Sequence, residues 1–325
     1  MSRYLVTGAA GFIGARVCEL LAEAGHAVTG VDNLNAAYDV RLKRWRLERL
    51  QARPEFSFAL ADVCDPHALA GVFDSAGAFD AVVNLAARAG VRQSLEDPVA
   101  YVETNVTGTL RLLELCRRHG VGKFVLASSS SLYGASGRLP YREDDDTNHP
   151  ISPYAASKKA AEALCHAYHA QCGLDVTVLR YFTVYGPAGR PDMSPLRFVQ
   201  WISEGRPLKM FGDGHQSRDF TYVDDIARGT ILGLRPLGHE IVNLGSDRPI
   251  EMLDVIRLIE RLVGREARIE HLPRHPADVP ATWADLSRAR SLLGWEPRTS
   301  HEEGFAALIR WYRENREWAR EIETT

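Results

Sequence analysis

The sequence predicts an α/β fold in which helices cover both faces of a doubly wound, parallel sheet. Short apolar runs of strand length alternate with longer helical patterns over residues 4–179, as in successive βαβ units. A glycine-rich turn joins the first apolar run to the first helical pattern. Because ligands of such sheets bind beyond the carboxyl ends of the strands, the residues that follow each strand are the first candidates for a binding site.

The first strand and helix enclose a candidate phosphate-binding turn. Tyr4-Leu5-Val6 is the apolar run, and Gly8, Gly11 and Gly14 follow it with the spacing G-x-x-G-x-x-G. Glycines let backbone N–H groups approach a pyrophosphate, and the N-terminus of the next helix supplies a partial positive charge. The spacing differs from the general G-x-G-x-x-G fingerprint, so this turn alone is a weak indication of a dinucleotide site.

The second expected strand ends in an acidic residue. The run from His26 to Val31 is followed by Asp32, roughly 20 residues beyond the glycines, where a carboxylate suits a ribose 2′-hydroxyl and repels a 2′-phosphate. This residue favours NAD over NADP. The basic stretch from Arg41 to Arg49 is the observation against that preference, and its simpler interpretation is the solvated face of an amphipathic helix.

The alternation of strands and helices continues to residue 179. Further strands are expected at 56–60, 81–85, 124–127 and 176–179. Helices are expected at 66–73, 98–119 and 153–172. Asp62-Val63 after one strand could contact adenine, and Leu85-Ala86-Ala87 after another offers small residues where a dinucleotide passes close. The serine run 128–131 follows the fifth strand and by itself is equally compatible with a polar loop.

A pair of residues in the helix expected at 153–172 can form a catalytic base. Tyr154 and Lys158 are four residues apart, so the phenol and the ammonium lie on one face of a helix. A neighbouring Lys⁺ and a cationic nicotinamide both favour phenolate over phenol. Helices carry this spacing by chance, and a surface pair is the commoner explanation, but Ser129 and the glycine turn reverse that judgement.

The pattern loosens beyond residue 179. Proline and glycine recur, the remaining strands are short, and Ile241 to Leu244 is expected to return to the sheet. We therefore expect residues 1–179 to form the cofactor-binding domain, with later returns of the chain to its sheet. Residues 180–325 are expected to form mainly a smaller substrate-binding lobe. The segment from His301 to Ile322 is amphipathic, contains Trp311 and Trp318, and is expected to serve for packing.

Composition indicates a small-molecule partner. The chain of 325 residues has a net charge of −3, which gives no basic field for nucleic acid or an anionic membrane surface. No apolar run approaches the ~18 residues of a membrane span, and Met1 leads directly into a strand-like segment, so export is not indicated. The five cysteines are dispersed and odd in number, which is typical of reduced thiols in a cytoplasmic protein.

A metal site is not expected. Cys165, His166, His169 and Cys172 lie within one expected helix and could offer metal ligands. They spread around its circumference, and no second group of ligands accompanies them. We therefore predict no metal.

Taken together, the motifs resemble the extended short-chain dehydrogenase/reductase superfamily, specifically its NAD-dependent nucleotide-sugar epimerases and dehydratases. The likeness runs from Tyr4 to about Tyr312 and includes Arg180-Tyr181-Phe182 as well as the motifs above. It implies a Rossmann-type fold, NAD as cofactor and a homodimer. It further implies catalytic roles for Ser129, Tyr154 and Lys158. The implied cofactor contacts are Gly8, Gly11, Phe12, Ile13, Gly14, Asp32, Asn33, Asp62, Val63, Leu85, Ala86, Ala87, Tyr154, Lys158 and Tyr181. Asn105 matches a family asparagine whose role stays open.

Two residues after the catalytic serine separate epimerases from their relatives. Dehydratases of this superfamily carry Asp-Glu directly after the catalytic hydroxyl residue, and decarboxylases carry Glu two positions after it. Ser130 and Ser131 occupy those places here and cannot do the same acid–base work. The chain therefore resembles an epimerase, in which no group has to leave the sugar.

Further stretches indicate the substrate. Residues 31–39, 89–92 and especially 183–193 resemble epimerases that convert UDP-glucuronate to UDP-galacturonate through a transient 4-keto sugar. Thr183 and Arg190 could bind the C6 carboxylate. By the same resemblance Arg218 reaches the diphosphate and Asp278 the uridine ribose. The full implied set of substrate contacts is Arg88, Ser129, Ser130, Thr183, Arg190, Arg218 and Asp278.

One departure and three alternatives accompany this prediction. Hexose epimerases often have arginine three residues before the ribose-binding aspartate, and this chain has His275. The main alternative is a 4-epimerase of UDP-glucose or UDP-N-acetylglucosamine, against which Thr183 and Arg190 argue. A net NAD(P)H-dependent reductase is less favoured because of Asp32. A non-catalytic, cofactor-binding regulator on the same fold is hard to reconcile with Ser129, Tyr154 and Lys158.

Overall fold

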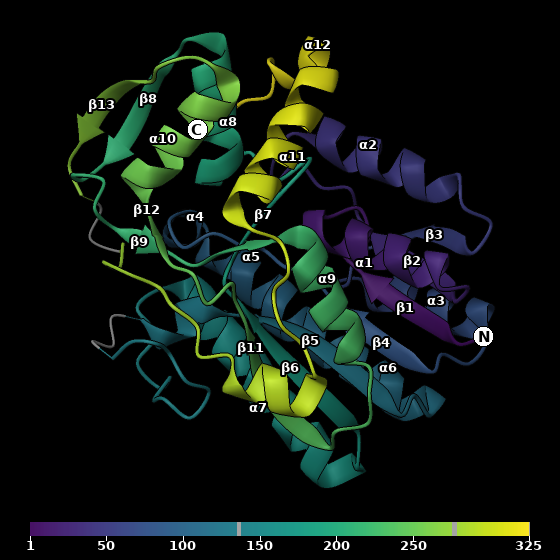
Figure 1. Cartoon of the computed structure of the whole chain (residues 1–325). Helices are drawn as coiled ribbons and strands as arrows, with labels where there is room; N and C mark the ends of the chain where they lie inside the picture. The colour runs from purple at the N-terminus through teal and green to yellow at the C-terminus, as the bar shows by residue number, and fades with distance from the viewer. Residues whose placement is uncertain (135–137, 275–277, 325) are drawn as a thin grey trace.

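The computed structural model describes residues 1–134, 138–274 and 278–324, and its centre is a seven-stranded parallel sheet (Figure 1). The strand order is β11-β6-β5-β4-β1-β2-β3, and every neighbouring pair in this sheet is parallel. The strands are β1 (Arg3–Thr7), β2 (Ala27–Asp32), β3 (Phe56–Leu60), β4 (Ala81–Asn84), β5 (Lys123–Ser129), β6 (Asp175–Tyr181) and β11 (His239–Leu244). The predicted α/β fold and doubly wound parallel sheet are confirmed, and β11 is the expected return of the chain.

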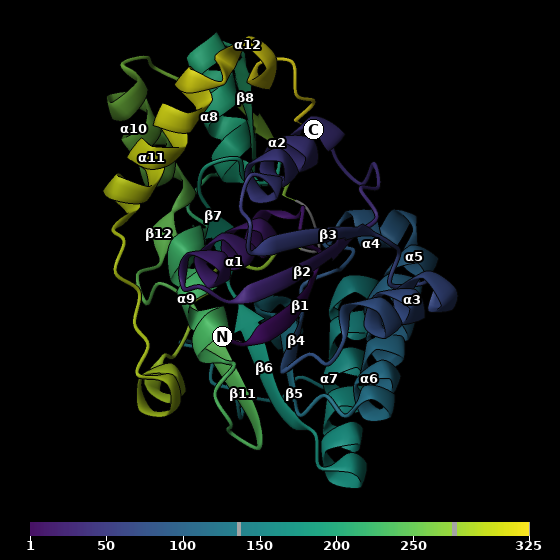
Figure 2. The same ribbon diagram turned by 90° about the vertical axis from the view of Figure 1, so that its right-hand side faces the viewer.

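Helices cover both faces of the sheet (Figure 2). One face packs against α1 (Phe12–Glu23) and α9 (Val223–Leu232), and the other packs against α3 (Pro66–Ala76), α6 (Gly108–His119) and α7 (Pro153–Cys172). All residues of the central strand β5 are buried, as expected for a parallel strand covered on both faces. The order of strands reverses between β1 and β4, so the crevice for ligands lies at the carboxyl ends of these two strands.

The sequence around α7 determines where its first turn lies. Ser152 caps the helix, because its hydroxyl accepts a hydrogen bond from the backbone N–H of Ala155 at 3.1 Å, and Pro153 occupies the first turn. Gly173 ends the helix in the left-handed conformation, with φ of 68°. These signals place Tyr154 in the first turn of α7.

The segment 98–119, expected as one helix, is interrupted. It consists of α5 (Pro98–Val102), a π-helical turn at Glu103–Thr107, and α6. Asn105 lies in the π-helical turn and is buried. Its amide donates to the carbonyl of Arg88 and to the hydroxyl of Ser157, both at 2.9 Å, and its oxygen accepts from the N–H of Arg88 at 2.9 Å. The helix therefore widens where a buried side chain fixes the backbone that follows β4.

A second hydrophobic core lies at one end of the molecule, apart from the sheet (Figure 1). The helices there are α8 (Ser194–Glu204), α10 (Met252–Val263), α11 (His301–Glu314) and α12 (Arg316–Ala319), and α2 (Val40–Gln51) contributes Leu42 to their core. The two-stranded pairs are β7 (Thr183–Tyr185) with β10 (Phe220–Tyr222), β9 (Ser217–Arg218) with β12 (Ile250–Glu251), and β8 (Pro207–Phe211) with β13 (Arg268–Leu272). The short helices are α4 (Gln93–Glu96), a 3-10 turn at Ser130–Tyr133 and a π-helical turn at Ala289–Leu293.

The C-terminal segment packs as expected and forms two helices. It breaks at Asn315, between α11 and α12. Trp311 is buried and its ring meets those of Trp45 and Trp318 edge-on, each at 5.8 Å between centroids. The five cysteines are free thiols. Over the described ranges, no helix combines the length and the apolar character needed to cross a bilayer.

Candidate functional site

The glycine turn packs directly against the backbone after β4. Gly8 has φ of +69°, and a Cβ atom there would lie 2.8 Å from the backbone nitrogen of Ala86. A Cβ atom on Gly14 would lie 2.0 Å from the carbonyl oxygen of Gly8. Neither position has room for a side chain, so the glycines give a turn whose backbone is open to a ligand at the start of α1.

This turn forms one wall of a cavity of about 330 Å³ at the carboxyl ends of the strands. Every residue that the sequence assigned to the cofactor lines it: Gly8, Gly11, Phe12, Ile13, Gly14, Asp32, Asn33, Asp62, Val63, Leu85, Ala86, Ala87, Tyr154, Lys158 and Tyr181. The lining residues extend from the glycine turn to the Tyr154–Lys158 pair, so the cavity fits an elongated dinucleotide. Asn33 donates to the carboxylate of Asp62 at 2.6 Å, which links the residues that follow β2 and β3.

Asp32 is buried and already oriented. Its carboxylate accepts hydrogen bonds from the N–H groups of Ala10 at 3.1 Å and Leu34 at 2.8 Å. The ammonium of Lys43 lies 3.6 Å from it and donates to Asn35 at 3.1 Å. Sequence analysis missed Lys43, because a lysine within a basic helix gives no sign of facing inward.

The interpretation of residues 41–49 as a solvated face is wrong for Lys43 and Arg46, which are only 5% and 4% exposed. Arg46 donates to the carbonyl of Ala10 at 3.0 Å and to the carbonyl of Ala188 at 3.2 Å. It thereby ties the glycine turn to the loop that carries Arg190. Ala188 has φ of +50°, a conformation that favours glycine, and the Arg46 contact helps to hold it there.

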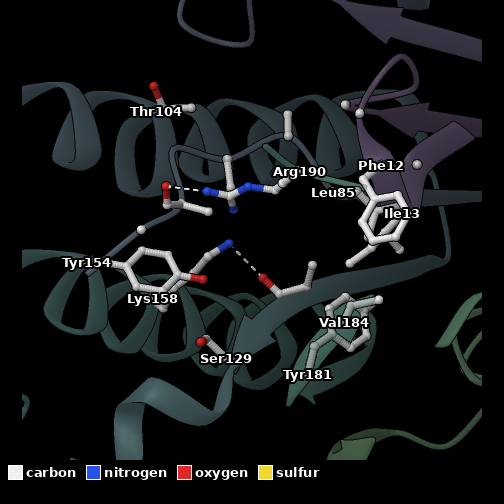
Figure 3. A pocket seen from close by; sticks show the side chains of 18 of the residues that line it. Phe12, Ile13, Leu85, Thr104, Ser129, Tyr154, Lys158, Tyr181, Val184 and Arg190 are labelled. Atoms are coloured by element: carbon white, nitrogen blue, oxygen red, sulfur yellow. Dashed lines mark hydrogen bonds between the residues drawn. The ribbon is translucent and has the colours of Figure 1, made fainter. Parts of the chain in front are cut away.

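The catalytic candidates converge on this cavity. Ser129 ends β5, and Tyr154 and Lys158 come from the first two turns of α7; Figure 3 shows these side chains and Arg190 pointing into the same space. The ammonium of Lys158 donates to the carbonyl of Ala127 at 2.8 Å. The sequence therefore identified residues that tertiary structure brings together from two separate elements.

Burial has the largest effect on the pKa values of Tyr154 and Lys158. It raises the pKa of the Tyr154 phenol, while hydrogen bonding to Ser129 and the positive charge of Arg190 oppose the rise. The sequence instead predicts Lys158 as the charge that lowers the pKa of Tyr154. Burial lowers the pKa of Lys158 to about 8, against the effect of the Glu162 carboxylate. Arg190 is thus a cation that favours the Tyr154 phenolate in this structure.

A buried ion pair lies one helical turn beyond Lys158. Glu162 accepts two hydrogen bonds from the guanidinium of Arg180, at 3.0 and 2.9 Å, and one from the hydroxyl of Ser128 at 2.5 Å. Both charged side chains are almost fully buried, at 4% and 2% exposure. Because Ser128 precedes Ser129, this pair fixes the end of β5 to α7. Sequence analysis missed Glu162, although its position four residues after Lys158 was a usable signal.

Arg190 has its own carboxylate partner. Its Nε donates to Asp192 at 3.0 Å, and its Nη2 donates to both Asp192 and the carbonyl of Ala89, the latter at 2.9 Å. The ion pair with Asp192 raises the pKa of Arg190 even though burial lowers it. The guanidinium is therefore charged and fixed at the wall of the cavity. Thr183, the other residue expected to bind a carboxylate, also lines this cavity.

A second cavity of about 550 Å³ adjoins the first and contains Arg218 and Asp278. The residues shared by the two cavities are Gly90, Val91, Ser130, Ser131, Thr183 and Met193. Arg92 donates to Asp278 at 2.7 Å, and burial lowers the pKa of Arg218. The geometry thus provides space for an elongated ligand that runs from Asp278 to Tyr154.

Two predicted residues stand apart from this arrangement. Arg88 lines neither cavity, and its backbone is held by Asn105. His275 lies outside the described residues. Within residues 1–134, 138–274 and 278–324, no group of three histidine, cysteine or acidic side chains is arranged to hold a metal ion.

Comparison with known proteins agrees with the site. Residues 4–245 match the NAD dependent epimerase/dehydratase family. The chain belongs to this family. A "UDP-glucuronate 4-epimerase" from Thermodesulfobacterium geofontis is 55% identical over 323 residues, which cover 99% of each chain. The resemblance stated from the motifs is therefore confirmed, and so is NAD as the cofactor.

Solved structures of family members share the whole fold. The UDP-glucuronic acid 4-epimerase from Bacillus cereus, in complex with UDP-glucuronic acid and NAD, is 37% identical with a TM-score of 0.90, covering 96% of this chain and 99% of that one. The UDP-glucose 4-epimerase from Thermotoga maritima, with UDP-glucose, is 32% identical with a TM-score of 0.89, at the same coverage. The glycine turn has an open backbone and Asp32 has an oriented carboxylate, and this geometry fits the NAD cofactor of the family.

Proposed function

We propose that this protein is an NAD-dependent epimerase that interconverts UDP-glucuronate and UDP-galacturonate through a transient 4-keto sugar. The observation that carries the proposal is the placement of Arg190 and Thr183 in the same cavity as Ser129, Tyr154 and Lys158. A fixed cation beside a catalytic base suits a sugar that bears a carboxylate at C6. The 55% identical relative bears the same activity in its name.

The catalytic side chains move a proton at the sugar 4-hydroxyl. Tyr154 as phenolate accepts that proton and later returns it to the 4-keto oxygen, so no proton is gained or lost overall. Ser129 stabilises the phenolate by a hydrogen bond, and Arg190 favours it by charge. When bound, NAD supplies the hydride acceptor at C4 and then the hydride donor. Return of the hydride to the opposite face of the ring inverts C4 without net redox change.

Arg190 and Thr183 also protect the intermediate. A 4-keto uronate is a β-keto acid, which loses CO₂ when its C5–C6 bond aligns with the carbonyl π system. Anchoring of the carboxylate by the fixed guanidinium of Arg190 prevents that alignment during the hydride steps. Ser130 and Ser131 provide no acid or base for elimination, which separates this site from that of a dehydratase.

The nucleotide half of the substrate is assigned to the second cavity. We place the diphosphate at Arg218 and the uridine ribose at Asp278, with the sugar between them and Tyr154, near Ser130. Residues 180–325 then form mainly the nucleotide-sugar-binding lobe, and residues 1–179 the NAD-binding domain. A homodimer, a cytoplasmic location and a place in carbohydrate metabolism complete the proposal.

The test is to mix the purified protein with UDP-glucuronate, without added NAD, and to follow the products by proton NMR. UDP-galacturonate is expected, formed with cofactor retained through purification. UDP-pentose instead would mean that Arg190 does not protect the carboxylate. No reaction with UDP-glucuronate, together with turnover of UDP-glucose or UDP-N-acetylglucosamine, would replace the proposal by the neutral-hexose alternative, which the Thermotoga maritima structure represents.

A further inference from the structure

The second cavity carries more positive charge than its own carboxylates balance. Four cationic side chains line it: Arg92, Arg197, Lys209 and Arg218. Its three carboxylates are Glu96, Asp192 and Asp278. Two of these are already paired, Asp278 with Arg92 and Asp192 with Arg190, and Glu96 is exposed. The cavity therefore has excess positive charge, which favours binding of an anion.

Among the three arginines of this cavity, Arg197 is the least compensated. It lies on α8, half-buried, and its guanidinium sits over the ring of Trp201 at 4.7 Å. Its Nε is buried and has no hydrogen-bond partner among the described residues. No carboxylate within the described ranges forms an ion pair with it, whereas Arg92 pairs with Asp278 and Arg218 donates to the carbonyl of Ser217 at 2.8 Å. A buried N–H group without a partner is unfavourable, and more so on a charged side chain.

The electrostatic surroundings agree with this geometry. Burial and the like charge of Arg92 lower the pKa of Arg197 to about 10, against the opposing effect of Asp192. Two guanidinium groups that repel each other in one cavity are stabilised together when an anion with several oxygen atoms binds between them.

We infer that Arg197 is a diphosphate ligand of the nucleotide-sugar substrate, acting with Arg218. From the sequence, Arg218 is the residue expected at the diphosphate, and His275 stands where hexose epimerases often have a second arginine. Arg197 supplies the second guanidinium from α8. It is held by Trp201, so that its planar fork is oriented before the substrate arrives. This inference rests on the proposed function for the identity of the ligand as a nucleoside diphosphate.

The test compares ligands that differ only in phosphate. Binding of uridine, UMP and UDP to the NAD-loaded protein is measured by calorimetry for the wild type, Arg197→Met and Arg197→Lys. Methionine keeps an apolar stem against Trp201 but removes the charge. The matched control is Arg257→Met, which removes an exposed arginine of α10 whose partner, Asp254, is on the same helix at 2.9 Å.

Arg197→Met is expected to weaken UDP binding by about 10- to 100-fold, the loss expected for hydrogen bonds to a charged group. Uridine binding should stay within about 2-fold of the wild type, since only phosphate contacts are lost. Arg197→Lys should recover part of the UDP affinity, because it keeps the charge but not the fork. Arg257→Met should change neither ligand.

Three results would overturn the inference: unchanged UDP affinity in Arg197→Met, equal weakening of uridine and UDP, or a wild type that does not bind UDP. Retained NAD content in each variant shows that the fold is intact. The assay needs no turnover, so its outcome is separate from that of the proposed function. A wild type that binds UDP but does not convert UDP-glucuronate would refute the epimerase and leave the role of Arg197 standing.

Discussion

The free energy of unfolding of the wild type, relative to Lys158→Met, is expected to rise with pH between pH 7 and pH 10. Burial of the Lys158 ammonium lowers its pKa from 10.5 to about 8 in the folded protein. In this pH window the unfolded chain binds more protons at residue 158 than the folded chain does. Stability therefore increases with pH for the wild type, and methionine removes that term.

The size of the effect follows from the two pKa values. A fall from 10.5 to about 8 corresponds to a penalty of about 3 kcal/mol for keeping the ammonium charged at neutral pH. About 2.5 kcal/mol of this is recovered between pH 7 and pH 10. The variant also loses the hydrogen bond to the carbonyl of Ala127, at a cost of about 1 kcal/mol. That loss is the same at each pH. It therefore shifts the stability curve of the variant by a constant amount and does not alter how the difference from the wild type changes with pH.

The measurement is urea denaturation of cofactor-free wild type and Lys158→Met at several pH values from 7 to 10. The control is Lys159→Met, which changes the next residue of α7, whose ammonium donates to the hydroxyl of Thr147 at 2.7 Å. The difference between wild type and Lys158→Met should change by about 2.5 kcal/mol over this range. Parallel stability curves for the two proteins would refute the reasoning that burial disfavours the charged lysine.

Three further predictions concern the base, the carboxylate site and the buried ion pair. Tyr154→Phe should lower the turnover of UDP-glucuronate by at least ~10²-fold, because the proton acceptor is lost, and a wild-type rate in an NMR assay would remove Tyr154 from the mechanism. Arg190→Ala should lose epimerisation of UDP-glucuronate and divert the substrate that still reacts to UDP-pentose and CO₂; unchanged kinetics, with Arg257→Ala as the control, would contradict the carboxylate assignment. Glu162→Gln should lower the free energy of unfolding by about 3–5 kcal/mol, because it leaves the Arg180 guanidinium buried without a counter-charge. Chemical denaturation measures this loss, and a change below about 0.5 kcal/mol, typical of an exposed surface site, would show that the pair is not needed.

The fold could be predicted because its signals are local. Strand-length apolar runs, the glycine turn, and the Ser152 cap and Pro153 start of α7 each depend on residues a few positions apart. The helix expected over 98–119 shows the limit of such signals. Its π-helical turn depends on Asn105 meeting the backbone of Arg88 and the hydroxyl of Ser157, contacts 17 and 52 residues apart along the chain. No local pattern contains that information.

The sequence by itself predicted the α/β class, NAD as the cofactor, and Ser129, Tyr154 and Lys158 as catalytic candidates, since each prediction depends on residue type at a fixed distance from a strand end or along one helix. Only the tertiary structure decided which charges act on one another. It turned Lys43 and Arg46 inward, placed Arg190 as a cation acting on Tyr154, and left Arg197 without a counter-charge beside Arg92. Electrostatic effects depend on distance and burial, and both arise only when segments far apart in sequence pack together.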